Sequence, residues 1–191
     1  MRTTADENSS FSRAIRSRIC AWIVTSSAVV GSSAMRMSGS FASAIAIIAR
    51  LKDEFASAVI LITHDLGVVA GIADRIGVMY AGRLVEFGGK RDLFYDPQHP
   101  YTWGLLGSIP RLDRPKQDRL HSIAGMPPSL IDPPAGCRFR PRCPHAFDRC
   151  ETEPALEVRG GGARHLDRCW LDPESKRALR DRTMRGESAA A

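Results

Sequence analysis

The sequence lacks several features that would assign a protein to a class at once. None of its apolar runs reaches the roughly 18–20 residues that a membrane-spanning helix needs, and the nearest, residues 19–31, is interrupted by Thr25, Ser26 and Ser27. Five cysteines in 191 residues are too few for a disulfide-rich secreted scaffold. No aromatic ladder accompanies the net charge of +6, so nucleic acid is not expected as a partner. The composition is that of a globular protein with a solvated basic surface.

Residues 1–41 are rich in serine and arginine and show neither helical nor strand periodicity. We expect them to form an unplaced, disordered leader. An alternative interpretation is a secretory signal peptide, because Arg13, Arg16 and Arg18 precede the apolar run and small residues follow it. The apolar run starts late for such a peptide, which favours the leader. Cys20 lies in this region without a partner at a useful spacing, and we interpret it as incidental.

Residues 42–109 alternate between helical and strand patterns. Apolar residues at helical spacing predict an amphipathic helix from Ala42 to Phe55. The continuous apolar run 58–62 is typical of a strand buried on both faces of a parallel sheet. Asp65 is expected to cap a helix at 66–73, and strands at 75–80 and 84–87 predict a hairpin. Short helices are expected near 91–95 and from Pro100. The fold class is therefore α/β.

His64 follows the predicted buried strand. The carboxyl end of a parallel strand lies at the edge where α/β folds bind ligands, so this imidazole could point at a bound phosphate. An ordinary loop histidine, hydrogen-bonded to its neighbours, is the alternative interpretation of the position.

Residues 110–172 form an irregular segment in which four cysteines are clustered. Repeated prolines exclude long helices here: Pro110, Pro115, Pro127, Pro128, Pro133, Pro134, Pro141 and Pro144. Cys137, Cys143, Cys150 and Cys169 have the spacing C-x5-C-x6-C-x18-C. Four thiolates satisfy either tetrahedral zinc or a [4Fe–4S] cluster, and the wide gaps suit the bulkier cluster better. Two disulfides or four free buried thiols remain open. His99, His121, His145 and His165 are available as substitute ligands but are not needed.

Several segments resemble one protein family. Residues 59–69 (VILITHDLGVV) and 73–86 (ADRIGVMYAGRLVE) resemble the switch-histidine region of ABC transporter ATPases. Residues 96–102 (DPQHPYT) resemble the extension of the ATP-binding subunits of oligopeptide and dipeptide importers, whose relatives also carry nickel. Residues 136–144 (GCRFRPRCP), with Cys150 and Cys169, resemble the cysteine-rich tail of the same family. The resemblance covers roughly residues 50–172.

The resemblance implies a division of the chain. Residues 42–109 would be the C-terminal portion of a P-loop NTPase-like ABC ATPase core, 110–172 a cysteine-rich extension, and 173–191 a charged, disordered tail. His64 would contact the γ-phosphate of ATP and orient the attacking water, and the four cysteines would hold an iron–sulfur cluster. Partners would be a second ATP-binding subunit, membrane-spanning permease subunits and a peptide-binding protein. The complex would lie at the inner, cytoplasmic face of the plasma membrane.

The sequence also departs from the family. It has no Walker A, signature or Walker B motif to hold ATP and magnesium, and the glycines of 82–89 lack the spacing and the Ser or Thr of a phosphate loop. We therefore expect a truncated subunit that does not hydrolyse ATP alone, and the chain's status as an enzyme stays open. Two alternative functions are an iron–sulfur or zinc-binding accessory module and a basic nucleic-acid-binding protein.

Overall fold

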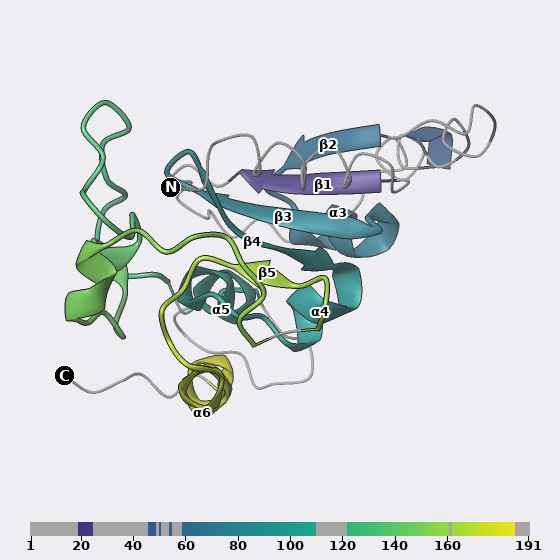
Figure 1. Ribbon diagram of the computed structural model, residues 1–191. Helices are drawn as coiled ribbons and strands as arrows, with labels where there is room; N and C mark the ends of the chain where they lie inside the picture. The colour runs from purple at the N-terminus through teal and green to yellow at the C-terminus, as the bar shows by residue number, and fades with distance from the viewer. Residues whose placement is uncertain are drawn as a thin grey trace. The chain divides into compact units, whose positions relative to one another are not determined.

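The structure is a computed structural model that describes residues 19–24, 46–48, 50, 54, 59–109, 122–160 and 162–185 (Figure 1). The chain divides into two compact units, Met1–Gly77 and Val78–Ala191. Helices and strands follow each other in both units, which confirms the α/β class.

The first unit contains a parallel strand pair and a helix. Strand β1 (Ile19–Val24) pairs in parallel with β2 (Val59–Thr63), and helix α3 (Leu66–Ile72) follows. As predicted, Asp65 is the N-cap of α3, and its Oδ1 accepts the N–H groups of Gly67 and Val68 over 2.8 and 3.1 Å. The prediction that β2 is buried on both faces is wrong. Ile60 and Ile62 are 48% and 68% exposed because successive side chains of a strand point to opposite faces.

Strand β1 also differs from the expected disordered leader. Its six residues are mostly apolar, and their backbone groups pair with a strand about forty residues later. A local sequence pattern does not predict such a distant pairing. Cys20 lies in this strand. Residues 46–48, 50 and 54 are helical, in agreement with the predicted amphipathic helix. The remaining residues of that helix and of the leader lie outside the described part of the chain.

The second unit contains the antiparallel strands β4 and β5. Strand β3 (Arg75–Tyr80) starts before the unit boundary and is followed by β4 (Arg83–Gly89), as the predicted hairpin requires. Its turn residues, Ala81 and Gly82, have φ values of 46° and 76°. The short strand β5 (Leu166–Asp167) pairs antiparallel with β4, placing Asp167 opposite Glu86.

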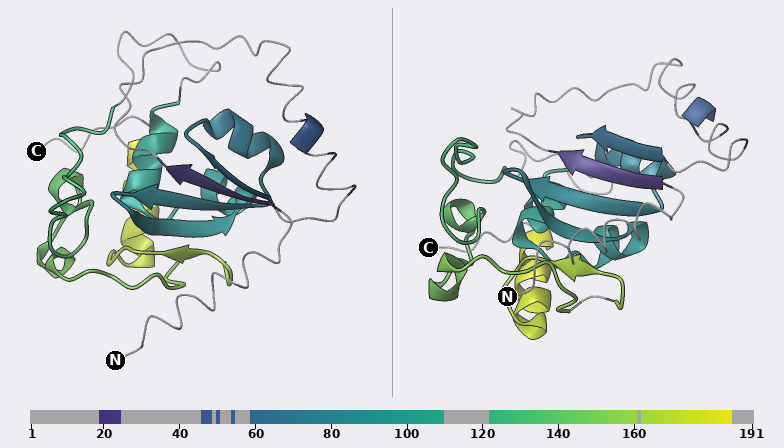
Figure 2. Two further views of the ribbon diagram at one scale, coloured as in Figure 1. Left: turned by 90° about the horizontal axis from the view of Figure 1, so that it is seen from above. Right: turned by 45° about the horizontal axis from the view of Figure 1, so that its top comes forward.

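Three helices and an aromatic cluster complete the second unit. Helix α4 (Lys90–Tyr95) and α5 (Pro100–Gly107) confirm the predicted short helices. Helix α6 (Pro173–Arg185) packs beside α5 (Figure 2). The rings of Tyr80, Tyr101 and Phe139 lie 4.6–5.3 Å apart, centroid to centroid, and Trp103 is fully buried.

Helix α6 corrects the prediction of a disordered tail from residue 173. Both Glu174 and Ser175 donate their backbone N–H groups to Oδ1 of Asp172, and Pro173 begins the helix. The capping carboxylate and the proline are start signals that the density of charges in this segment obscured.

Residues 122–160 contain only short helical turns, η1 (Arg140–Arg142) and η2 (Asp148–Glu151), as the prolines predict. Figure 1 shows this segment as green loops. Within the described ranges, no helix combines the length and the apolar character that a membrane span requires.

Candidate functional site

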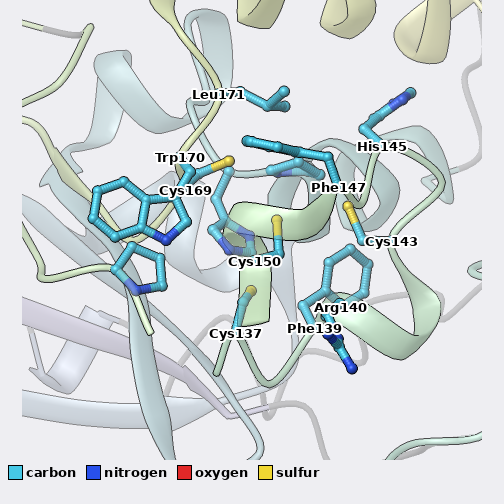
Figure 3. Close-up of a pocket in the computed structure, with 13 residues that line it drawn as sticks. Cys137, Phe139, Arg140, Cys143, His145, Phe147, Cys150, Cys169, Trp170 and Leu171 are labelled. Carbon is cyan, nitrogen blue, oxygen red and sulfur yellow. The ribbon is translucent and has the colours of Figure 1, made fainter. Parts of the chain in front are cut away.

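The four cysteines of the C-terminal segment line one cavity. Figure 3 shows the sulfur atoms of Cys137, Cys143, Cys150 and Cys169 around it. All four are free thiols; Cys150 and Cys169 are buried, and the other two are half-buried. Residues up to 32 positions apart are therefore brought to one place, as the sequence clustering predicts.

Short turns and close backbone contacts position these cysteines. Cys143 follows η1, Cys150 lies within η2, and the backbone N–H of Cys137 donates to the carbonyl of Cys150 over 2.9 Å. Gly136 makes this approach possible. Its φ is +74°, and a Cβ there would stand 2.4–2.5 Å from the carbonyl oxygens of Cys150 and Glu151.

Burial favours the protonated form of Cys137, Cys143 and Cys169. Removal from water raises the pKa of Cys143 and of Cys169 to about 12, and also raises that of Cys137. The buried ring of Phe139 is part of the cavity wall, together with Trp170. Because metals bind thiolates, loading this cavity with a metal would release protons.

The four thiols around the cavity are candidate ligands for a metal ion or a cluster. Zinc bonds sulfur at about 2.3 Å, so the ligands of one ion must stand close together. Among the described residues, no three histidine, cysteine, aspartate or glutamate side chains are placed to share one metal ion. A [4Fe–4S] cluster is held by four thiolates, each on a different iron, so its ligands stand farther apart. The four free thiols that line this cavity match the ligands of such a cluster in number and type alone.

Two histidines line the same cavity, with different availability. His99 is buried, its Nδ1 accepts the N–H of Tyr101 over 3.1 Å, and burial lowers its pKa to about 3. His145 follows Cys143 closely, and its buried Nε2 has no hydrogen-bond partner within the described residues. Burial also lowers the pKa of His145. His145 is therefore the better substitute ligand; His121 lies outside the described residues.

A buried carboxylate connects β4 to α5 and to β5. Glu86 accepts the backbone N–H groups of Gln98 and His99 over 2.6 and 3.1 Å, at the start of α5. His165 Nε2 lies 2.6 Å from Oε1 of Glu86, and both side chains are fully buried. Burial disfavours the imidazolium of His165, but the hydrogen bond and charge of Glu86, together with the charges of Asp92 and Asp167, outweigh this, so the pKa is raised.

A second buried ion pair lies beside Cys169. The Nζ of Lys176 donates to Oδ1 of Asp167 over 2.7 Å, and both side chains are fully buried. Burial raises the pKa of Asp167 to about 6, although Lys176 opposes this. Neither buried pair was predicted from the sequence. Charged residues in a basic, proline-rich segment give no signal that they are buried.

His64 belongs to the first unit, directly after β2 and before the cap of α3. Its side chain is exposed. Its expected contact with a phosphate stays a prediction.

Parts of the chain are similar to known transport proteins. Residues 85–150 match the family described as the oligopeptide/dipeptide transporter C-terminal region. The chain is 55% identical over 112 residues to the oligopeptide transport ATP-binding protein OppD of Salmonella typhimurium, covering 59% of this chain and 33% of that protein. It is 52% identical over 117 residues to the dipeptide transport ATP-binding protein DppD of Bacillus subtilis, covering 61% and 34%.

The chain thus spans about a third of the length of these relatives. The matches do not support the alternatives of an accessory metal-binding module or a nucleic-acid-binding protein. The family match lies within residues 50–172, over which the sequence resembles the ATP-binding subunits of these importers. Residues 85–150 are therefore similar to the C-terminal region of oligopeptide/dipeptide transporter proteins, and both relatives are ATP-binding proteins of oligopeptide or dipeptide transport.

Proposed function

We propose that this chain supplies the C-terminal part of an ATP-binding subunit in an oligopeptide or dipeptide import system. The 55% identity to OppD over 112 residues carries the proposal, and the family match at 85–150 supports it. In that system, the chain works with a second ATP-binding subunit, permease subunits and a peptide-binding protein at the inner face of the plasma membrane. His64 serves as the histidine that contacts the γ-phosphate of ATP.

Nucleotide chemistry in this system requires residues beyond those of the chain. Phosphoryl transfer depends on positioning the phosphates and Mg²⁺, which a Walker A loop and a Walker B aspartate provide. The sequence contains neither motif. The chain alone therefore binds no Mg·ATP tightly and does not hydrolyse it, and His64 acts only where another polypeptide supplies the phosphate site.

Two measurements test this proposal. In a titration of the purified chain with Mg·ATP, we expect no saturable binding; tight binding would show that the assignment of the missing nucleotide site is wrong. In a second experiment, the tagged chain is co-expressed with the permease subunits and second ATP-binding subunit of an oligopeptide importer. We expect the tagged chain to co-purify with these subunits, and a full-length ATP-binding subunit to displace it. If the chain does not co-purify, the assignment to this complex is wrong.

The four cysteines are the proposed cofactor site. We assign them a [4Fe–4S] cluster, with zinc as the alternative metal, because four free thiols surround one cavity in a segment with little regular secondary structure. When bound, the cluster supplies covalent links between three parts of the segment. Cys137 and Cys143 flank η1, Cys150 lies in η2, and Cys169 follows β5. The role is structural, because it fixes chain segments that prolines exclude from helices.

Metal analysis after anaerobic purification tests the site. We expect about four iron and four sulfide per chain. Cys143→Ser should lower the iron content, whereas Cys20→Ser, which alters the one cysteine outside this group, should leave it unchanged. Zinc without iron would replace the cluster by a structural zinc site. A stably folded wild-type chain that contains neither iron nor zinc would refute both assignments.

A further inference from the structure

The buried pair of Lys176 and Asp167 is joined directly to the backbone of Cys169. Oδ1 of Asp167 accepts the ammonium of Lys176 over 2.7 Å and also the backbone N–H of Cys169 over 2.9 Å. A single carboxylate oxygen therefore connects helix α6 to a cysteine that lines the cavity.

The stability of the pair does not by itself explain its presence. Taking an ammonium and a carboxylate out of water is costly, and apolar residues of similar volume are often as stabilising in such a place. Both side chains are fully buried, which is rare for lysine and aspartate. A specific geometric role explains the pair better. Oδ1 of Asp167, which Lys176 and Cys169 share as acceptor, holds the backbone nitrogen of Cys169.

The backbone on either side of this contact is fixed independently. Asp167 is anchored in β5, where it stands opposite Glu86, and it exchanges two backbone hydrogen bonds with Glu157 over 2.9 and 3.2 Å. Lys176 lies in the first turn of α6, whose N-terminus is capped by Asp172. The Asp167 side chain therefore links two anchored elements, and Cys169 follows two residues after one of them.

We propose that Asp167 and Lys176 are positioning residues that fix Cys169 so that its sulfur faces the other three cysteines. Lys176 acts through Asp167. Its ammonium neutralises the carboxylate, whose second oxygen, Oδ2, has no hydrogen-bond partner within the described residues. Without the lysine, the buried carboxylate loses its partner and turns toward water, which leaves the N–H of Cys169 without its acceptor.

The inference deepens the proposed cysteine site and rests on it, but its geometry can be tested without metal. The reduced, metal-free chain is alkylated with a maleimide, and the rate at each cysteine is followed by peptide mass spectrometry. In Lys176→Met, we expect the rate at Cys169 to rise about tenfold, equivalent to about 1.4 kcal/mol of easier local opening. The rates at Cys143 and Cys150 should stay near those of the wild type.

Three further variants separate positioning from general loss of structure. Arg177→Met changes an exposed neighbour on the same helix and should leave all rates unchanged. Lys176→Gln keeps a hydrogen-bond donor and should raise the Cys169 rate by a smaller factor. This variant tests the inference if Lys176→Met does not fold. The double variant Asp167→Asn/Lys176→Met removes both charges but keeps an oxygen for the Cys169 N–H. It should return the Cys169 rate toward the wild-type value.

The outcomes are distinct. An unchanged Cys169 rate in both Lys176 variants, an equal rise at all four cysteines, or a double variant without recovery would each overturn the inference. In a parallel measurement with iron and sulfide, Lys176→Met should release iron to a chelator faster than Arg177→Met does. If the wild-type chain takes up no iron, the cluster assignment fails, while the alkylation rates still decide the role of Asp167 and Lys176.

Discussion

Replacement of Glu86 by alanine should be among the most destabilising single changes in the second unit. Its carboxylate accepts the N–H groups of Gln98 and His99 and contacts His165, all in buried positions. Hydrogen bonds to a charged group contribute about 1.5–3 kcal/mol each, and breaking a buried ion pair costs about 3–5 kcal/mol. Because these contributions overlap, we expect a loss of about 4 kcal/mol in the free energy of unfolding.

Urea unfolding followed by tryptophan fluorescence measures this loss. With a slope of about 2 kcal/mol per M, the midpoint should fall by about 2 M. Glu151→Ala is the matched control, because Glu151 pairs with Arg140 over 2.8 Å in a mostly exposed position. It should change stability by less than about 1 kcal/mol. If Glu86→Ala cost no more than Glu151→Ala, the reasoning from buried hydrogen bonds would be refuted.

Three other changes give separate predictions. Gly136→Ala should destabilise the chain by at least about 1–3 kcal/mol in the same urea assay, because of its positive φ and the carbonyl of Cys150. Gly162→Ala, where a Cβ meets nothing within 4 Å, should cost little, and equal losses would contradict this account. Asp172→Ala should lower stability by about 1 kcal/mol and reduce helical circular dichroism; an unchanged spectrum and midpoint would exclude the cap. The pKa of His165 is raised in the folded state, so the stabilisation by His165 is complete below about pH 6.5 and is lost as the pH rises through the folded-state pKa. The difference in unfolding free energy between wild type and His165→Gln should therefore shrink on alkalinisation. A difference that grows would show that the sign is wrong.

Local signals explain which elements were predicted. The cap of α3 by Asp65, the hairpin turn and the proline at the start of α5 each lie within a few residues of the element that they define. The clustering of four cysteines likewise predicted one local site, because prolines leave few other means of organising the segment, and the four side chains do line one cavity. These features depend on chemistry that is visible over a short stretch of sequence.

Non-local contacts explain what was missed. Strand β1 pairs with a strand about forty residues away, and Glu86 contacts His165 across 79 positions. No pattern near Lys176 indicates its burial, since a lysine among charged residues is typical of a solvated helix face. Whether a charged side chain is buried depends on the partner that the tertiary structure places next to it.

The basic character of the C-terminal segment has a structural explanation that the charge count alone does not give. Arg142 donates from Nε and Nη2 to the carbonyls of Ala124 and Ile123 over 2.9 and 2.8 Å. Arg168 donates to the carbonyls of Leu84 and Pro154 over 2.8 and 3.0 Å.

Arg138 similarly donates to the carbonyl of Ala81 in the β3–β4 turn. A segment interrupted by prolines lacks backbone N–H donors, so its carbonyl oxygens need other partners. The guanidinium group supplies several donors in one rigid plane, which allows one arginine to hold two carbonyls. These three arginines thus supply donors to backbone carbonyls, so part of the positive charge of the chain has a structural role.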